Sequence, residues 1–279
     1  RILLPEGTGK VSFATSVVSY FAMFAQLGIP TYGIRACAKI RDNREKLTKT
    51  VQELFIINFT MSLIAYVALF GAIALVPRLQ QDKSLFLIVS LTILFNAIGM
   101  EWLYKALEQY TYITIRSIIF KFIALVAMFA LIHQKSDYVI YGGISILAAS
   151  ASNIFNFFHV HKYVSLKPVG NYNFKQHFNA VAVFFAMSCA TTIYTHLDTV
   201  MLGFMTSDVD VGYYNAAVKI KSILVSIVTS LGVVLLPRAS YYVEHNLMEE
   251  FYRITKKATN FVFLVASPMM VYFIIFAKE

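Results

Sequence analysis

Charged side chains make up only 14% of this 279-residue chain, whereas hydrophobic residues make up 58%. Soluble domains usually carry about 25% charged residues, so the composition excludes an ordinary soluble protein. The two cysteines, Cys37 and Cys189, fall in a basic loop and an apolar run, so a disulfide scaffold is excluded. The sequence also lacks the GxSxG, HExxH, CxxC and GK[ST] motifs, which excludes the enzyme classes built on them.

Long apolar runs recur along the whole sequence with only short polar breaks between them. Each run is close to or longer than the ~20 residues that a helix needs to cross a bilayer. Backbone groups in lipid must bond within their own segment, and barrel strands would be about half as long and alternate in polarity. We therefore expect an all-α, polytopic membrane helix bundle with about eight spans, at 11–33, 51–76, 84–103, 113–132, 139–160, 178–204, 212–236 and 257–277.

Lys and Arg gather in alternate breaks between these runs. Fifteen lie in the breaks around 34–50, 104–116, 161–177 and 237–257, and six lie in the other set. Because cytoplasmic loops carry an excess of Lys and Arg, the first set is predicted to be cytoplasmic and both ends of the sequence outside. No signal peptide is recognisable, and we expect both ends to be cut from a longer protein.

A faint internal repeat relates the starts of the first and seventh runs. Gly9 and Gly212 are each followed by a small polar residue three positions on and by Ala five positions on. Because the two starts are six runs apart, an even number, the two halves would run parallel, as in transporters that bind substrate between two bundles. The repeat predicts an N-terminal bundle at 1–175 that lacks its first helix, and the first half of a truncated C-terminal bundle at 176–279.

Lys121 lies near the middle of an apolar run. A lysine at that depth costs ~2.5–3.5 kcal/mol by insertion scales. One interpretation is a water-filled cavity in which the ammonium group meets an anionic substrate. The alternative is a buried structural pair with a polar or acidic residue of a neighbouring helix.

Asp198 and Lys219 are predicted to lie at similar depth on antiparallel neighbouring helices, at 1.5 Å of rise per residue. They form either a static ion pair or a pair that protonation or cation binding releases, which would couple transport to an ion gradient. Lys221 falls on a different helix face.

Glu101, Lys105 and Glu108 are spaced to share one stripe at a cytoplasmic helix end. A solvated, salt-bridged face and an inner gate are both open interpretations. Arg35 directly follows the first run, so it is either a topology anchor or a phosphate contact at the inner mouth of a cavity.

Several segments resemble the polysaccharide flippases of the superfamily of multidrug, oligosaccharidyl-lipid and polysaccharide exporters. The most specific is 101–110 (EWLYKALEQY), which leads into 113–117 (ITIRS). The others are 27–35 (LGIPTYGIR) with the charged stretch 39–47, 197–203 (LDTVMLG) with 212–214 (GYY), and 1–7 (RILLPEG).

This resemblance implies a MATE-like fold of two six-helix bundles around a V-shaped cavity that faces each side in turn, with helices two to nine in this chain. It implies the movement of an undecaprenyl-pyrophosphate-linked oligosaccharide across the bacterial inner membrane, driven by an ion gradient. The cationic cavity of the family matches Lys121 and Lys219 in type, and we expect Arg1 and Arg35 to belong to it. Ion coupling or gating is expected of Asp198 and Glu101.

The physics of the substrate supports this hypothesis, because a charged sugar headgroup cannot cross hydrocarbon unaided. A drug antiporter of the same fold should have an acidic cavity, which Lys121 and Lys219 argue against. A membrane glycan polymerase or transferase should show a large outer loop, and none is visible. We expect a transporter rather than an enzyme, with no cofactor or metal and no nucleic-acid partner. The expected partners are the lipid-linked oligosaccharide, membrane lipids and other polysaccharide-assembly proteins.

Overall fold

The computed structural model describes residues 2–165, 167–244 and 247–276, with the backbone alone at 224, 227–241 and 243–244. These described residues form helices and no strand, which confirms the predicted all-α membrane bundle. They form two compact units, Arg1–Asn215 and Ala216–Glu279. The expected division of the chain at 175/176 stays a prediction.

Each of the eight apolar runs falls on a helix or on two consecutive helices. Among the described residues, six helical segments are long and apolar enough to span a membrane, and α5 is a shorter apolar helix. A four-residue helix, α4 (Pro77–Gln80), lies in the break after the second run. In chain order the runs are α1 (Leu4–Gln26) with α2 (Ile29–Ala38), α3 (Arg44–Leu75), α5 (Lys83–Gly99) with α6 (Glu101–Ala106), α7 (Tyr110–Leu131), α8 (Tyr138–Ile146) with α9 (Asn153–His159), α10 (Lys175–Met205), α11 (Asp208–Glu244) and α12 (Met248–Phe276).

Three of the runs are discontinuous helices. Leu27 and Gly28 have φ of 47° and 71°, which ends α1, and a proline in the first turn of α2 restarts the helix. Met100, with φ of 41°, separates α5 from α6. A π-helical turn, Leu147–Ala151, separates α8 from α9. Such breaks are tolerated at membrane depth only where the freed backbone groups face protein or a polar cavity.

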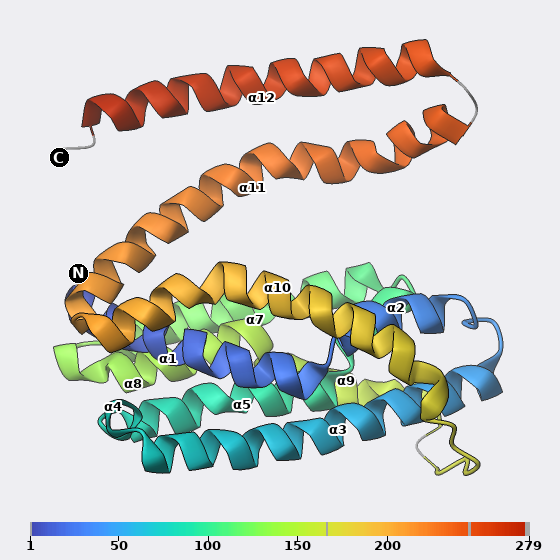
Figure 1. Ribbon diagram of the computed structural model, residues 1–279, viewed down its shortest axis with the longest axis horizontal. Helices are drawn as coiled ribbons and strands as arrows, with labels where there is room; N and C mark the ends of the chain where they lie inside the picture. Colours follow the sequence, from blue (N-terminus) through green and yellow to red (C-terminus); the bar gives the residue numbers. More distant parts are fainter. Residues whose placement is uncertain (1, 166, 245–246, 277–279) are drawn as a thin grey trace. The chain divides into compact units, whose positions relative to one another are not determined.

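The helices of the first unit lie side by side, and their connections alternate between its two ends (Figure 1). We call the inner end the one that carries the connections 39–43, 107–109 and 163–174, which the charge bias predicts to be cytoplasmic. The outer end carries 76–82, 132–137 and 206–207.

Two of the segments that carry the resemblance, 27–35 and 101–110, pack against each other at the inner end. A Cβ atom added at Gly33 of α2 would lie 2.6 Å from Cε3 of Trp102 on α6, so only glycine fits there without movement. Trp102 is buried in a cluster that also contains Ile29, Leu54 and Leu103. This contact fixes the position of α2, which begins directly after the break that ends α1.

Candidate functional site

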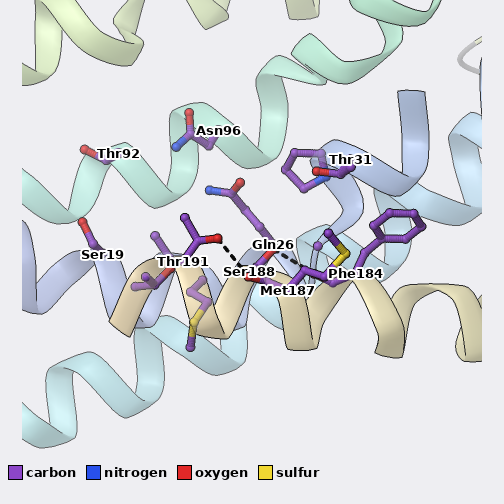
Figure 2. Close-up of a pocket in the computed structure, with 14 residues that line it drawn as sticks. Ser19, Gln26, Thr31, Thr92, Asn96, Phe184, Met187, Ser188 and Thr191 are labelled. Atoms are coloured by element: carbon purple, nitrogen blue, oxygen red, sulfur yellow. Dashed lines mark hydrogen bonds between the residues drawn. The ribbon is translucent and has the colours of Figure 1, made fainter. Parts of the chain in front are cut away.

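A pocket of about 460 Å³ lies between α1, α2, α5 and α10 of the first unit. Of the described residues that line it, none is charged. Figure 2 shows hydroxyl and amide side chains from three of these helices around the space, namely Ser19, Gln26, Thr92, Asn96, Ser188 and Thr191. The pocket therefore offers hydrogen bonds without a net charge.

Hydroxyl groups of α10 face the pocket with acceptor capacity left over. The Ser188 hydroxyl donates to the carbonyl of Phe184 and the Thr191 hydroxyl to that of Met187, each at 3.0 Å (Figure 2). These bonds use the hydroxyl hydrogens and satisfy the side chains within their own helix. The oxygen lone pairs remain free to accept hydrogen bonds from a ligand.

Donors are supplied by α1 and α5. Asn96 accepts a hydrogen bond at Oδ1 from Asn153 at 3.2 Å, so its own amide nitrogen remains available. Among the described residues, the buried hydroxyl of Thr92 has no hydrogen-bond partner, and the Gln26 amide forms no hydrogen bond either. Free donors beside free acceptors match a ligand rich in hydroxyl groups, each of which both donates and accepts.

The break between α1 and α2 forms part of the pocket wall, since Gly28, Pro30 and Thr31 all line it. A Cβ atom at Gly28 would overlap the backbone of Phe184 on α10, and the positive φ of Gly28 would strain any other residue. Glycine therefore lets the interrupted helix approach α10 closely. Binding sites of membrane transporters are typically formed by discontinuous helices of this kind.

Arg35 lies beside this pocket. It is exposed on α2, and its guanidinium carbon lies 5.1 Å from the ring centroid of Phe184, a lining residue. This cation–π contact places a permanent positive charge next to a neutral polar pocket. The structure thus brings one of the four predicted cationic residues to the candidate site.

Lys121 and Lys219 lie elsewhere. Lys121 is exposed on α7 beside Phe122 and Ile118, which are 65% and 60% exposed, and it does not line the pocket. Its two interpretations, a cavity residue and a buried structural pair, both stay predictions. Lys219 is exposed on α11 in the second unit. Their role in a cationic cavity stays a prediction.

Asp198 is exposed on α10 and accepts a hydrogen bond at Oδ2 from the Tyr214 hydroxyl at 2.6 Å. The predicted pair of Asp198 with Lys219 would join the two units and stays a prediction. Arg1 lies outside the described residues.

The Glu101 carboxylate forms ion pairs with two basic side chains at the inner end. Its carboxylate lies 2.8 Å from Lys105 Nζ and 3.0 Å from Arg116 Nη2. Arg116 is 6% exposed, and its Nε and Nη1 groups have no partner among the described residues. Arg116 was predicted to be a loop cation, whereas the fold buries it against Glu101. The gating role expected of Glu101 stays a prediction.

Glu108 does not share a stripe with Glu101 and Lys105, so that expectation was wrong. The helix ends at Ala106, and Glu108 adopts a φ of 56° that turns the chain away. Its carboxylate pairs with Arg41 of the α2–α3 connection at 2.8 Å, and this hydrogen bond raises the pKa of the Arg41 guanidinium. Because both side chains are exposed, the pair contributes little to stability.

The outer end of the first unit is closed by a glycine contact that the sequence analysis did not foresee. A Cβ atom at Gly9 of α1 would overlap the carbonyl of Asp208, and one at Gly212 of α11 would overlap that of Pro5. The two glycines of the faint repeat therefore allow the first turns of α1 and α11 to touch. Arg78 and Asp208 form an ion pair at the same end.

Comparison with known proteins gives related matches. Two proteins described as "Putative O-antigen transporter" are similar to this chain. The one from Escherichia coli (strain K12) is 23% identical over 261 residues, which cover 93% of this chain and 63% of the relative. The one from Shigella dysenteriae is 24% identical over 245 residues, which cover 86% and 61% respectively. The chain thus spans less than two thirds of either relative.

No solved structure matches the chain significantly. A family model described as "Polysaccharide biosynthesis protein" matches residues 1–243, which is most of the chain. The chain is a multi-pass membrane protein and belongs to this polysaccharide biosynthesis family.

Proposed function

We propose that this protein transports a lipid-linked oligosaccharide across the bacterial cytoplasmic membrane. The substrate would be an undecaprenyl-pyrophosphate-linked oligosaccharide that moves from the inner to the outer leaflet, for O-antigen, capsule or exopolysaccharide synthesis. The observation that carries this proposal is the uncharged hydroxyl- and amide-lined pocket with Arg35 at its edge. The names of the two relatives support a transport role rather than an enzymatic one.

We propose that the pocket and Arg35 bind different parts of the substrate. Sugar hydroxyls lose hydrogen bonds to water on entering the membrane, and an unpaired polar group there costs several kcal/mol. The unpaired Thr92, Asn96 and Gln26 groups replace part of that hydration. Arg35 pairs with the diphosphate, because a guanidinium binds phosphate oxygens in a bidentate manner. The lipid tail stays in the bilayer.

The alternatives fit the pocket less well. A MATE-type antiporter for cationic drugs needs acidic groups in its cavity, and of the described residues that line this pocket none is acidic. A glycan polymerase or transferase needs acidic or histidine groups close to a sugar, and the lining set contains neither type. Membrane lipids and other polysaccharide-assembly proteins are the partners that this proposal implies.

The test is to weaken the pocket in the protein expressed from its intact gene. Thr92→Val, Asn96→Leu and Gln26→Leu should each reduce the appearance of lipid-linked oligosaccharide on the outer face, by roughly tenfold per lost hydrogen bond of about 1.4 kcal/mol. The matched control is Thr195→Val, which removes a back-bonded hydroxyl of α10 that does not line the pocket. Lys121→Gln and Lys219→Gln test the predicted cationic cavity in the same assay.

Two outcomes would contradict the proposal. Pocket variants that reach normal abundance and still present the oligosaccharide at the control rate would remove the pocket from the mechanism. Export of an organic cation by cells carrying the intact gene, with no effect on oligosaccharide presentation, would favour the drug antiporter.

A further inference from the structure

A buried acidic and imidazole cluster lies at the inner end of the first unit, close to the pocket. Glu53 of α3 is 0% exposed and His177 of α10 is 3% exposed. His177 Nε2 lies 2.8 Å from Glu53 Oε2, and His177 Nδ1 lies 2.7 Å from the Tyr32 hydroxyl of α2. The consecutive helices α2 and α3 thus meet the distant helix α10 through one imidazole ring.

The carboxylate of Glu53 is fully hydrogen-bonded. Its Oε1 accepts from the backbone N–H of Asn173 at 2.7 Å, and its Oε2 accepts from the Gln176 side chain and from His177, both at 2.8 Å. Three donors compensate the burial of an ionised carboxylate. With His177 neutral, Nε2 carries the hydrogen toward Glu53, and Nδ1 accepts from the Tyr32 hydroxyl.

The same geometry accepts one further proton at Nδ1 of His177. The protonated ring keeps its bond to Glu53 and donates from Nδ1 to the Tyr32 oxygen, so the Tyr32 hydroxyl must turn its own hydrogen away. The net charge of the cluster changes from −1 to 0. Proton binding therefore reverses the direction of the hydrogen bond between Tyr32 on α2 and His177 on α10. It also turns the hydrogen bond between His177 and Glu53 on α3 into an ion pair.

Two of the three helices joined by this cluster, α2 and α10, also form the pocket. Tyr32 directly follows Thr31, which lines the pocket, and its ring centroid lies 6.1 Å from that of Phe184, another lining residue. Phe184 and His177 are two turns apart on α10. Any movement of α10 away from α2 and α3 must separate His177 from Glu53 and Tyr32.

The surroundings leave the imidazole as the proton acceptor. Apart from His177, the titratable neighbours of Tyr32 are Glu53 and Cys37 on α2. The Cys37 thiol is neutral at neutral pH, so it adds no charge to the cluster. The segment before α10 contributes the uncharged Asn173 N–H, and α10 itself contributes the Gln176 amide. Arg35 packs over Phe184.

We propose that Glu53, His177 and Tyr32 form a proton-binding site that couples proton uptake at His177 to the movement of α10 at the pocket. The inference rests on the proposed transport function and names its driving ion as the proton. When α10 separates from α3, the proton leaves His177 for solvent or stays to neutralise Glu53. Release to solvent returns the net charge of the cluster from 0 to −1, whereas transfer to Glu53 leaves it at 0. Release is therefore the step that couples proton movement to the movement of α10.

The test uses vesicles that carry the complete protein, with and without an imposed pH gradient. It measures how fast the lipid-linked oligosaccharide appears on the outer face. Wild-type transport should be stimulated at least tenfold by an imposed pH gradient. Glu53→Gln and His177→Gln should lose that stimulation but keep slow, gradient-independent equilibration. The control is His161→Gln, because His161 is exposed and its ring bonds only the carbonyl of Phe158 among the described residues.

Tyr32→Phe separates coupling from structure, because it removes the hydroxyl at Nδ1 and leaves the Glu53 contact intact. It should move the pH midpoint of transport and the imidazole titration of His177, followed by nuclear magnetic resonance in the purified protein, by a similar amount. Unchanged gradient stimulation in Glu53→Gln and His177→Gln, or a His177 ring signal that does not respond to pH, would overturn the inference. If wild-type vesicles present no oligosaccharide at all, the transport proposal fails instead.

Discussion

Arg78 and Asp208 form an ion pair that joins α4 to the first turn of α11 at the outer end of the first unit. The two side chains are 20% and 17% exposed. Arg78 also donates from Nε to the carbonyl of Gly203 at 3.1 Å, and its guanidinium carbon lies 4.9 Å from the ring centroid of Phe13. Because these partners come from α1, α10 and α11, the arginine ties three helices together where an outward-facing cavity would have to open.

We predict that breaking this ion pair favours opening toward the outside. Arg78→Gln leaves the largely buried Asp208 carboxylate without its ion-pair partner, which costs about 1–3 kcal/mol in the closed state. Asp208→Asn should have a smaller effect, because Arg78 keeps its longer pair with Asp82 at 3.7 Å. A Ser19→Cys reporter in the pocket should then react with an impermeant maleimide from outside roughly tenfold faster. The charge swap Arg78→Asp with Asp208→Arg should restore only part of the protection, because the acidic side chain introduced at position 78 also faces Asp82. Equal labelling in single variants and wild type would show that the pair does not hold the outer end closed.

The Gly9–Gly212 contact gives an independent prediction about the same end. Gly9→Leu or Gly212→Leu places a side chain where the backbone of the opposite helix lies, so the first turns of α1 and α11 must move apart. Labelling of the same reporter should increase several-fold. The control is Gly71→Leu, since a Cβ atom at Gly71 has nothing within 4 Å. Strong labelling in the control and not in the two variants would contradict the assignment.

The membrane helices were predictable because lipid imposes a length and a polarity that the sequence shows directly. Pro30 is a local signal for the break before α2, because proline removes a helix hydrogen bond. The break at Met100 had no such signal, because neither proline nor a glycine at the positive-φ position marks it. Its conformation is fixed by tertiary packing of α6 against α2, which no local pattern encodes.

The candidate site was predictable only in part. Arg35 was identified because a cation at the end of an apolar run is conspicuous. Thr92 and Asn96 were missed because an uncharged polar side chain inside an apolar run does not stand out in a sequence as a charged one does. Glu53 and His177 lie near the ends of their runs, where charged residues usually face water. Only the fold shows that both are buried and bonded together.

The packing of Gly33 against Trp102 predicts a loss of stability at the inner end. Gly33→Val places a methyl-bearing carbon within 2.6 Å of the indole ring, and overpacking of this kind costs typically 1–3 kcal/mol. The melting temperature in detergent should fall by several degrees. Combining the change with Trp102→Leu should recover part of the loss, because the smaller side chain vacates the space. An unchanged melting temperature in Gly33→Val, or no recovery in the double variant, would contradict this contact.

The start of α11 predicts a pH dependence. Ser207 donates to Asp210 Oδ2 from its hydroxyl at 2.7 Å and from its backbone N–H at 3.2 Å, and these bonds lower the pKa of Asp210. We call these two hydrogen bonds the Ser207–Asp210 cap. Because the pKa of Asp210 is lower in the folded state, the cap stabilises α11 fully at pH above the unfolded pKa of about 3.9, and this stabilisation is lost as the pH falls through the folded pKa. Carboxyl carbon titration should show the lowered pKa, and Ser207→Ala should raise it. A titration that Ser207→Ala leaves unchanged would exclude the cap.

Variants of Arg35 distinguish between a role as a topology anchor and a role as a substrate contact. Arg35→Gln removes the charge beside the pocket and should reduce outer-face oligosaccharide by at least tenfold. Arg35→Lys keeps the charge but loses the planar, bidentate guanidinium and its stacking on Phe184, so it should recover only part of the transport. Lys39→Gln is the matched control, because it removes an exposed cation from the same inner end. A topology reporter fused after α3 should read the same in all three variants if Arg35 contacts substrate. Inverted topology in Arg35→Gln with full activity in Arg35→Lys would instead identify an anchor, because orientation depends on charge and not on guanidinium geometry.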